Sequence, residues 1–145
     1  MAPLPGAVTA RTERLAAPLR TITDFSALVV SDDPGATRVL VAVFRAMDIS
    51  SLTVVGSDEV PDYDLFDLAI IATGGEVAAA LDAADRIRAH HGPAGVHIVL
   101  LTLAATEEMQ RAVVWKRIDA IMLKPVTILA LTAHIERAID RRMRA

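Results

Sequence analysis

The chain has 145 residues, of which 53% are hydrophobic and 23% charged, so it can bury the core of one globular domain. It contains no cysteine, which excludes disulfides and thiolate metal sites and fits a reducing cytoplasm. A net charge of −3 disfavours general nucleic-acid binding, and no apolar run approaches the ~20 residues of a membrane-spanning helix. We expect a cytoplasmic protein that binds neither nucleic acid nor membrane.

Residues 1–24 differ in composition from the rest of the chain. Three prolines and a glycine interrupt this stretch, which also holds four threonines and three arginines. Residues that break regular elements at this density are typical of loops and tails. We expect a flexible N-terminal extension over 1–24, followed by a single domain over 25–145 without internal repeats.

Five short apolar segments predict strands. The third, Leu68–Ala72, has no polar residue at any position and directly precedes Thr73. Continuous apolar runs of this length are typical of strands that are buried on both faces of a parallel sheet. The predicted strands span residues 27–30, 52–55, 68–72, 96–101 and 120–123.

Four longer segments carry apolar residues at every third or fourth position, which predicts amphipathic helices. Asp33 and Pro34 fit the N-cap and the first position of one helix, and Thr106 fits the N-cap of another. The last helix is expected to bury Ile128 and Leu131. The predicted helices span residues 34–47, 73–90, 106–115 and 127–143.

Strands that alternate with helices predict a parallel sheet with helices on both faces. The stretch 56–66, between the second and third strands, is short and interrupted by Pro61, so the helix at this point is expected to be short or absent. The expected fold class is α/β, a three-layer sandwich around five parallel strands. Their carboxyl ends share one edge, where open sheets of this class place their chemistry. The residues expected at this edge are Ser31, Asp32, Asp33, Ala72, Thr102 and Lys124.

This ordered set resembles the receiver (CheY-like) domain of bacterial two-component response regulators. The resemblance covers residues 27–138, and it places Thr102 30 residues after Ala72 and Lys124 22 residues after Thr102, which fits the family's pattern without a gap. It implies a flavodoxin-like (βα)5 fold. It also implies a pocket in which an acid pair holds Mg²⁺, an aspartate accepts a phosphoryl group from a histidine kinase, and a hydroxyl and a lysine contact the phosphoryl oxygens.

Several positions depart from that pattern. Ala72 stands where the family has its phospho-accepting aspartate, Ser31 replaces the first acid, and Ile121 replaces an aromatic that changes rotamer. A methyl group cannot attack phosphorus, so the chain is interpreted as a degenerate pseudo-receiver without a cofactor. Asp32 and Asp33 leave at most a weak residual Mg²⁺ site, and the lysine is expected to pair with one of them.

The expected role is phosphorylation-independent signalling through protein contacts, in a two-component or phosphorelay-type pathway. No nucleophile with a neighbouring base can be identified, so we expect no enzymatic activity. Trp115 and Ile121 are expected to mark a contact surface for a protein partner or a second copy, made by helix 106–115, strand 120–123 and helix 127–143.

Three other interpretations stay open on the sequence alone. Trp115 can instead fold back over the end of the core. The emptied pocket can bind a small anion or nucleotide, since strand ends and helix N-termini present amides to anions. The chain can also be a regulatory domain cut from a longer response regulator.

Overall fold

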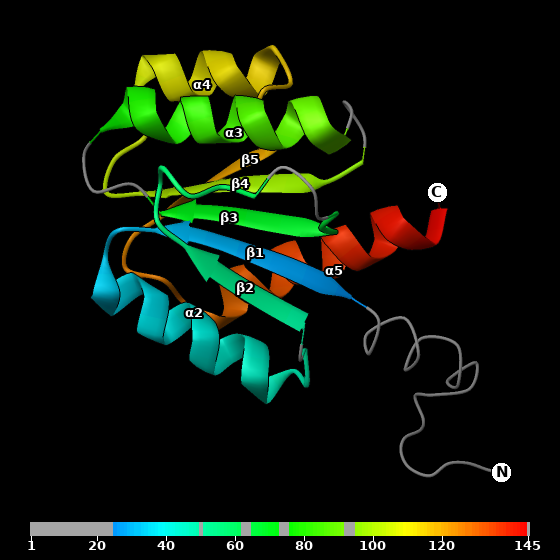
Figure 1. Ribbon diagram of the computed structural model, residues 1–145. Coiled ribbons are helices and arrows are strands. Elements are labelled where there is room, and N and C mark those ends of the chain that lie inside the picture. The colour runs from blue at the N-terminus through cyan, green and yellow to red at the C-terminus, as the bar shows by residue number, and fades with distance from the viewer. Residues whose placement is uncertain (1–24, 50, 62–64, 73–75, 92–94, 145) are drawn as a thin grey trace, which may run out of the picture.

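A computed structural model shows how the predicted elements are arranged (Figure 1). It describes residues 25–49, 51–61, 65–72, 76–91 and 95–144. The predicted extension over 1–24 lies outside these residues, and so does Thr73, where helix 73–90 was expected to begin. Both expectations stay predictions.

Five parallel strands form one sheet, in the order β2-β1-β3-β4-β5. This is the strand order of flavodoxin-like doubly wound folds, and it confirms the predicted α/β class. The strands are β1 Ser26–Ser31, β2 Ser51–Val55, β3 Leu68–Ala72, β4 His97–Thr102 and β5 Ala120–Leu123.

Four helices cover the two faces of the sheet, and they complete the three layers (Figure 1). α2 and α5 pack on one face, and α3 and α4 pack on the other. The described residues between β2 and β3 form no helix, as predicted. The helices are α2 Pro34–Ala46, α3 Val77–His91, α4 Glu107–Val114 and α5 Ile128–Arg144. Of these described helices, none is long and apolar enough to cross a membrane.

Side-chain caps fix where three of the helices begin. The Asp33 carboxylate accepts from the Gly35 amide at 3.0 Å, and Pro34 takes the first helical position, as predicted. Thr106 accepts from the Met109 amide at 3.2 Å at the start of α4. The Thr127 hydroxyl accepts from the Ala130 amide at the start of α5. The beginnings of α2, α4 and α5 are therefore encoded locally.

Two apolar clusters, one on each face, make up the core. β3 is buried along its whole length, which confirms its predicted place at the centre of the sheet. Leu40 and Phe44 of α2 pack with Leu131 of α5 on one face, while Leu81 and Ile87 of α3 pack on the other. The core is therefore mostly aliphatic, as a chain with only 3% aromatic residues requires.

One core prediction is wrong. Ile128 was expected to be buried, but it is 69% exposed. It begins α5 shortly after β5 ends, so it stands at the carboxyl edge, where the sheet no longer offers a surface to cover it. The buried stripe of α5 starts one turn later, at Leu131, and continues to Ile135.

Candidate functional site

The carboxyl edge of the sheet brings together the ends of four strands. Ser31 of β1 is paired in register with Ala72 of β3, and Thr102 of β4 with Leu123 of β5. The next residue, Lys124, donates its backbone N–H to the Thr102 carbonyl at 2.7 Å. All six residues predicted for this edge therefore lie on it or directly after its strands.

Lys124 and Asp33 form an ion pair across this edge. The Lys124 Nζ lies 3.1 Å from Asp33 Oδ2, and the lysine side chain is only 14% exposed. The hydrogen bond from Lys124 and the backbone amides of Ala36 and Gly35 hold the pKa of the Asp33 carboxyl below its usual value. The prediction that the lysine pairs with one of the two acids is confirmed, and the acid is Asp33.

The remaining polar groups of the edge bond to nearby backbone. Asp32 accepts from the Ser57 amide at 3.3 Å, on the β2 side of the edge, whereas Asp33 faces α2 and Lys124. Thr102 donates to the Ala104 carbonyl, and the Ser31 hydroxyl donates to the Asp33 carbonyl. The two acids therefore diverge. Within the described residues, no group of three or more acidic or histidine side chains is placed to hold a metal ion.

A small cavity lies beside Ala72. It has a volume of about 110 Å³, and Asp32 and Glu76 are among its lining residues. Pockets for small organic ligands usually measure roughly 300–1,000 Å³. A space this small, with two carboxylates in its wall, is poorly suited to a nucleotide or another anion.

Trp115 lies at the C-terminal end of α4 and is 73% exposed. It does not fold back over the core, so that alternative is wrong. Its neighbour Val114 is also exposed. Ile121 is only partly buried and packs against the core cluster under α3 and α4. Trp115 is thus a surface residue, whereas Ile121 belongs to the periphery of the core.

Further exposed apolar side chains were missed from the sequence. Leu123 of β5, Leu129 of α5 and Leu103 after β4 are all exposed, as is Ile128. The sequence did contain a signal for Ile128 and Leu129, because residues 128–131 are four consecutive apolar positions. A single buried stripe of a helix cannot accommodate all four.

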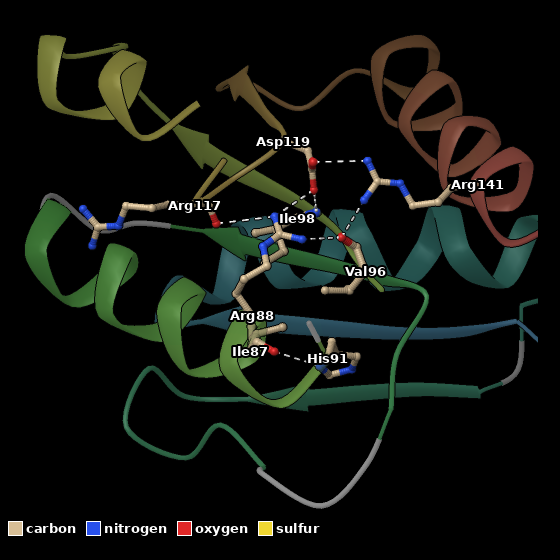
Figure 2. A network of polar contacts seen from close by, with 8 residues as sticks. All are labelled: Ile87, Arg88, His91, Val96, Ile98, Arg117, Asp119 and Arg141. Carbon is tan, nitrogen blue, oxygen red and sulfur yellow. Dashed lines mark hydrogen bonds and ion pairs between the residues drawn. The ribbon is translucent and has the colours of Figure 1, made fainter. Parts of the chain in front are cut away.

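A buried polar network at the opposite edge of the sheet was also missed (Figure 2). Asp119, just before β5, forms ion pairs with Arg88 of α3 at 3.0 Å and Arg141 of α5 at 3.2 Å. It also accepts from the Ile98 amide at 2.8 Å, and both arginines donate to the Val96 carbonyl. Burial works to raise the pKa of Asp119, but the Ile98 amide and the two arginines outweigh it and hold the pKa below its usual value. The network joins helices from opposite faces, so its role is structural.

The fold matches solved receiver structures. A CheY-like response regulator receiver domain from Methanospirillum hungatei matches with a TM-score of 0.65 and 17% identity, over 83% of this chain and 98% of that one. The receiver domain of a sensor histidine kinase from Pseudomonas aeruginosa, with a magnesium ion coordinated in its active-site cleft, matches with a TM-score of 0.63 and 20% identity, over 80% and 98%. This chain has the receiver fold.

A two-component response regulator from Clostridium difficile matches with a TM-score of 0.65 and 16% identity, over 84% of this chain and 100% of that one. At these identities the similarity concerns the fold. No protein-family model matches the sequence, and no curated protein matches it. The function of this receiver fold therefore has to be argued from its own residues.

Proposed function

We propose that this chain is a degenerate receiver that signals without phosphorylation, through protein contacts in a two-component or phosphorelay-type pathway. Its contact surface is made by α4, β5 and the first turn of α5. The occupant of this surface is a partner protein or a second copy of the chain. The proposal includes no catalytic step and no cofactor.

Independence from phosphorylation is supported by the state of the carboxyl edge. An aspartyl phosphate needs a carboxylate oxygen that attacks phosphorus, and Ala72 ends β3 with a methyl group. Lys124 is engaged with Asp33, whose other carboxylate oxygen caps α2. Ala72 therefore cannot accept a phosphoryl group, and Lys124 and Asp33 bond to each other instead of to a phosphoryl group or its metal ion.

The observation that carries the proposal is the placement of exposed apolar side chains. Val114 and Trp115 end α4, Leu123 lies in β5, and Ile128 and Leu129 begin α5, and all five are exposed. Leu123, Ile128 and Leu129 lie near the carboxyl end of this side of the sheet, and Val114 and Trp115 lie toward its other end, because α4 runs back along the sheet (Figure 1). Exposed apolar patches on soluble domains mark interaction sites, and tryptophan is enriched at the residues that dominate binding.

Truncation of the tryptophan tests the surface. We expect Trp115→Ala to weaken association by about 30-fold, which corresponds to the ~2 kcal/mol of a hot-spot residue. The free energy of unfolding should change by less than about 0.5 kcal/mol, because the residue is exposed. Sedimentation of the chain alone, and with purified histidine kinases and response regulators of the same organism, measures association, and thermal melts measure stability.

Leu65→Ala is the matched control, because Leu65 is a similarly exposed apolar residue that lies before β3, away from this surface. It should leave association unchanged. Loss of thermal stability in Trp115→Ala with intact association would instead make Trp115 a structural residue and exclude this surface.

A further inference from the structure

β2 is an end strand of the sheet, where it pairs with β1. Its sequence, Ser51–Val55, contains no charged residue and no proline. Proteins usually protect edge strands with such residues, because the outer row of backbone N–H and C=O groups is a template for another strand. The side chain of Val54 is 43% exposed beside this edge. Among the described residues, none with a charge or a proline ring protects the β2 edge.

A groove of about 590 Å³ runs along this edge, between β2 and α2. Val54 and Val55 line it from the strand side. On α2 the lining residues recur at every third or fourth position, so they form a second stripe beside the buried stripe of Leu40, Val43 and Phe44. This second stripe consists of Pro34, Thr37, Arg38, Val41, Ala42 and Arg45.

Charge is distributed unevenly along the groove. At the carboxyl end of β2 the groove is lined by Asp32 and Glu59, and Glu59 accepts from the Gly56 amide at 3.1 Å. Asp58 lies in the same turn. Arg38 is near this end, so acids exceed bases there. Arg45 lies in the last turn of α2, toward the other end, because α2 runs back along the sheet (Figure 1).

We propose that a second copy of this chain docks on this edge, with the two β2 strands paired antiparallel across a two-fold axis. The two five-stranded sheets then become one continuous sheet. The axis reverses the partner, so the acidic end of each groove meets the Arg45 end of the other. Such an interface is isologous, and each Glu59–Arg45 contact occurs twice.

The spacing of the elements suits this arrangement. Paired strands lie about 4.8 Å apart, and α2 packs against both β1 and β2. Two copies of α2 would then lie roughly 10 Å apart across the axis, which is close to the 8–10 Å of packed helices. Val41 and the small Ala42 lie near the middle of the stripe, where two helices approach most closely.

The opposite edge strand is a poorer candidate for this kind of pairing. β5 has four residues, and it lies between Asp119 and Lys124, which are both held in ion pairs. It also belongs to the α4–β5–α5 contact surface. Pairing through β2 leaves that surface free at both outer edges of the joined sheet. The dimer thus presents two equivalent contact surfaces, which raises avidity for a bivalent partner.

Sedimentation velocity over a broad concentration series tests the dimer. The full chain should reach twice its 15.5 kDa mass. Val54→Lys places a charge on the edge and should raise the dimer dissociation constant at least about tenfold. Val39→Lys is the matched control, since Val39 is 41% exposed on α2 but outside the groove, and it should sediment like the wild type. Circular dichroism verifies that each variant is folded.

Charge reversal tests the register. Arg45→Glu and Glu59→Arg should each weaken the dimer, and the double variant should recover it. A wild type that stays monomeric, a Val54→Lys variant that dimerises like the wild type, or a double variant no better than the single ones would each overturn the inference. If Trp115→Ala dissolves the dimer and Val54→Lys does not, self-association uses the α4–β5–α5 surface, so this inference fails while the proposed function stands.

Discussion

Ala72 occupies the centre of the carboxyl edge, paired in register with Ser31 on one side and Leu101 on the other. Its methyl group is nearly buried, and Asp32 borders the small cavity beside it. A carboxylate at this position would share that cavity with Asp32 and Glu76. Ala72 offers no carboxylate at this position, and Lys124 bonds with Asp33 nearby at the same edge.

We predict that beryllofluoride with Mg²⁺ forms no adduct with this chain. The adduct mimics a phosphoryl group on a carboxylate, and Ala72 offers no oxygen to bind it. Fluorine NMR should show free fluoride species only, while a receiver domain that keeps the aspartate gives a bound signal under the same conditions. A bound signal from this chain would show that another carboxylate takes the role, and it would contradict phosphorylation independence.

The choice between Asp32 and Asp33 as the partner of Lys124 could not be made from the sequence. Both acids follow β1, and although the sequence predicts Asp33 as a helix N-cap, it does not show that the cap position lies beside Lys124. The start of α2 decides the matter, because Asp33 takes the N-cap position and its carboxylate is held at the helix end beside Lys124. Asp32 is turned instead to the amide of Ser57.

At the scale of the elements, periodicity predicted every described helix and strand, but not the partners that each would find. The network around Asp119 joins residues 22 and 31 positions away in the sequence. No local spacing rule connects such residues, since they meet only after α3 and α5 have packed on opposite faces of the sheet. In the sequence, Arg88 and Arg141 look like ordinary solvated positions of helices.

Breaking this network should destabilise the fold strongly. Asp119 is only 13% exposed, and its removal leaves the buried Arg88 guanidinium without this carboxylate. We expect Asp119→Asn to lower the free energy of unfolding by roughly 3 to 5 kcal/mol, the usual effect of removing one partner of a buried ion pair. Urea denaturation of the wild type and the variant measures the difference.

Asp85→Asn is the matched control for this prediction. Asp85 pairs with Arg117 at 2.7 Å, but both side chains are well exposed, so the loss should stay below about 1 kcal/mol. Equal losses of unfolding free energy in the two variants would mean that the burial of Asp119 does not increase its contribution to stability. The joint between α3, α5 and β4 would then depend on apolar packing alone.

At the scale of the whole molecule, the alternation of strands and helices predicted a parallel sheet with helices on both faces, and the resemblance to receiver domains implied the flavodoxin-like fold. The short link between β2 and β3 was also predicted, because Pro61 and its acidic neighbours exclude a long helix there. The exposed surfaces were predicted less well. Trp115 was correctly expected to be exposed, whereas the exposure of Leu103 and Leu123 depends on where the sheet ends, which hydrophobic patterning does not encode.

Acid stability is a property of the whole molecule that two buried histidines should control. His97 of β4 and His134 of α5 lie with their rings 5.8 Å apart, and both are buried. Burial lowers the pKa of His97 to about 4, with Arg141, His134 and Arg137 acting in the same direction and Asp119 opposing them. Burial and Arg137 also lower the pKa of His134. The folded state therefore resists protonation of this pair.

The sign of the pH effect comes from this resistance. The unfolded chain binds a proton at His97 below about pH 6.5, whereas the folded chain does so only near pH 4. Stability is thus fully present above pH 6.5. It falls as the pH drops toward 4, by up to about 1.4 kcal/mol per pH unit for each histidine. Urea denaturation at pH 7, 6 and 5, above the range where carboxylates titrate, measures this slope.

His97→Gln should flatten the slope between pH 7 and 5, because it removes a group that the unfolded chain protonates and the folded chain does not. His90→Gln removes an exposed imidazole instead and should leave the slope as it is in the wild type. Proton NMR of the folded wild type gives an independent measurement, since the His97 ring should stay neutral at pH 5.5. A His97 ring that titrates near pH 6.5 in the folded state, together with an unchanged slope in His97→Gln, would remove the buried pair as the source of acid sensitivity.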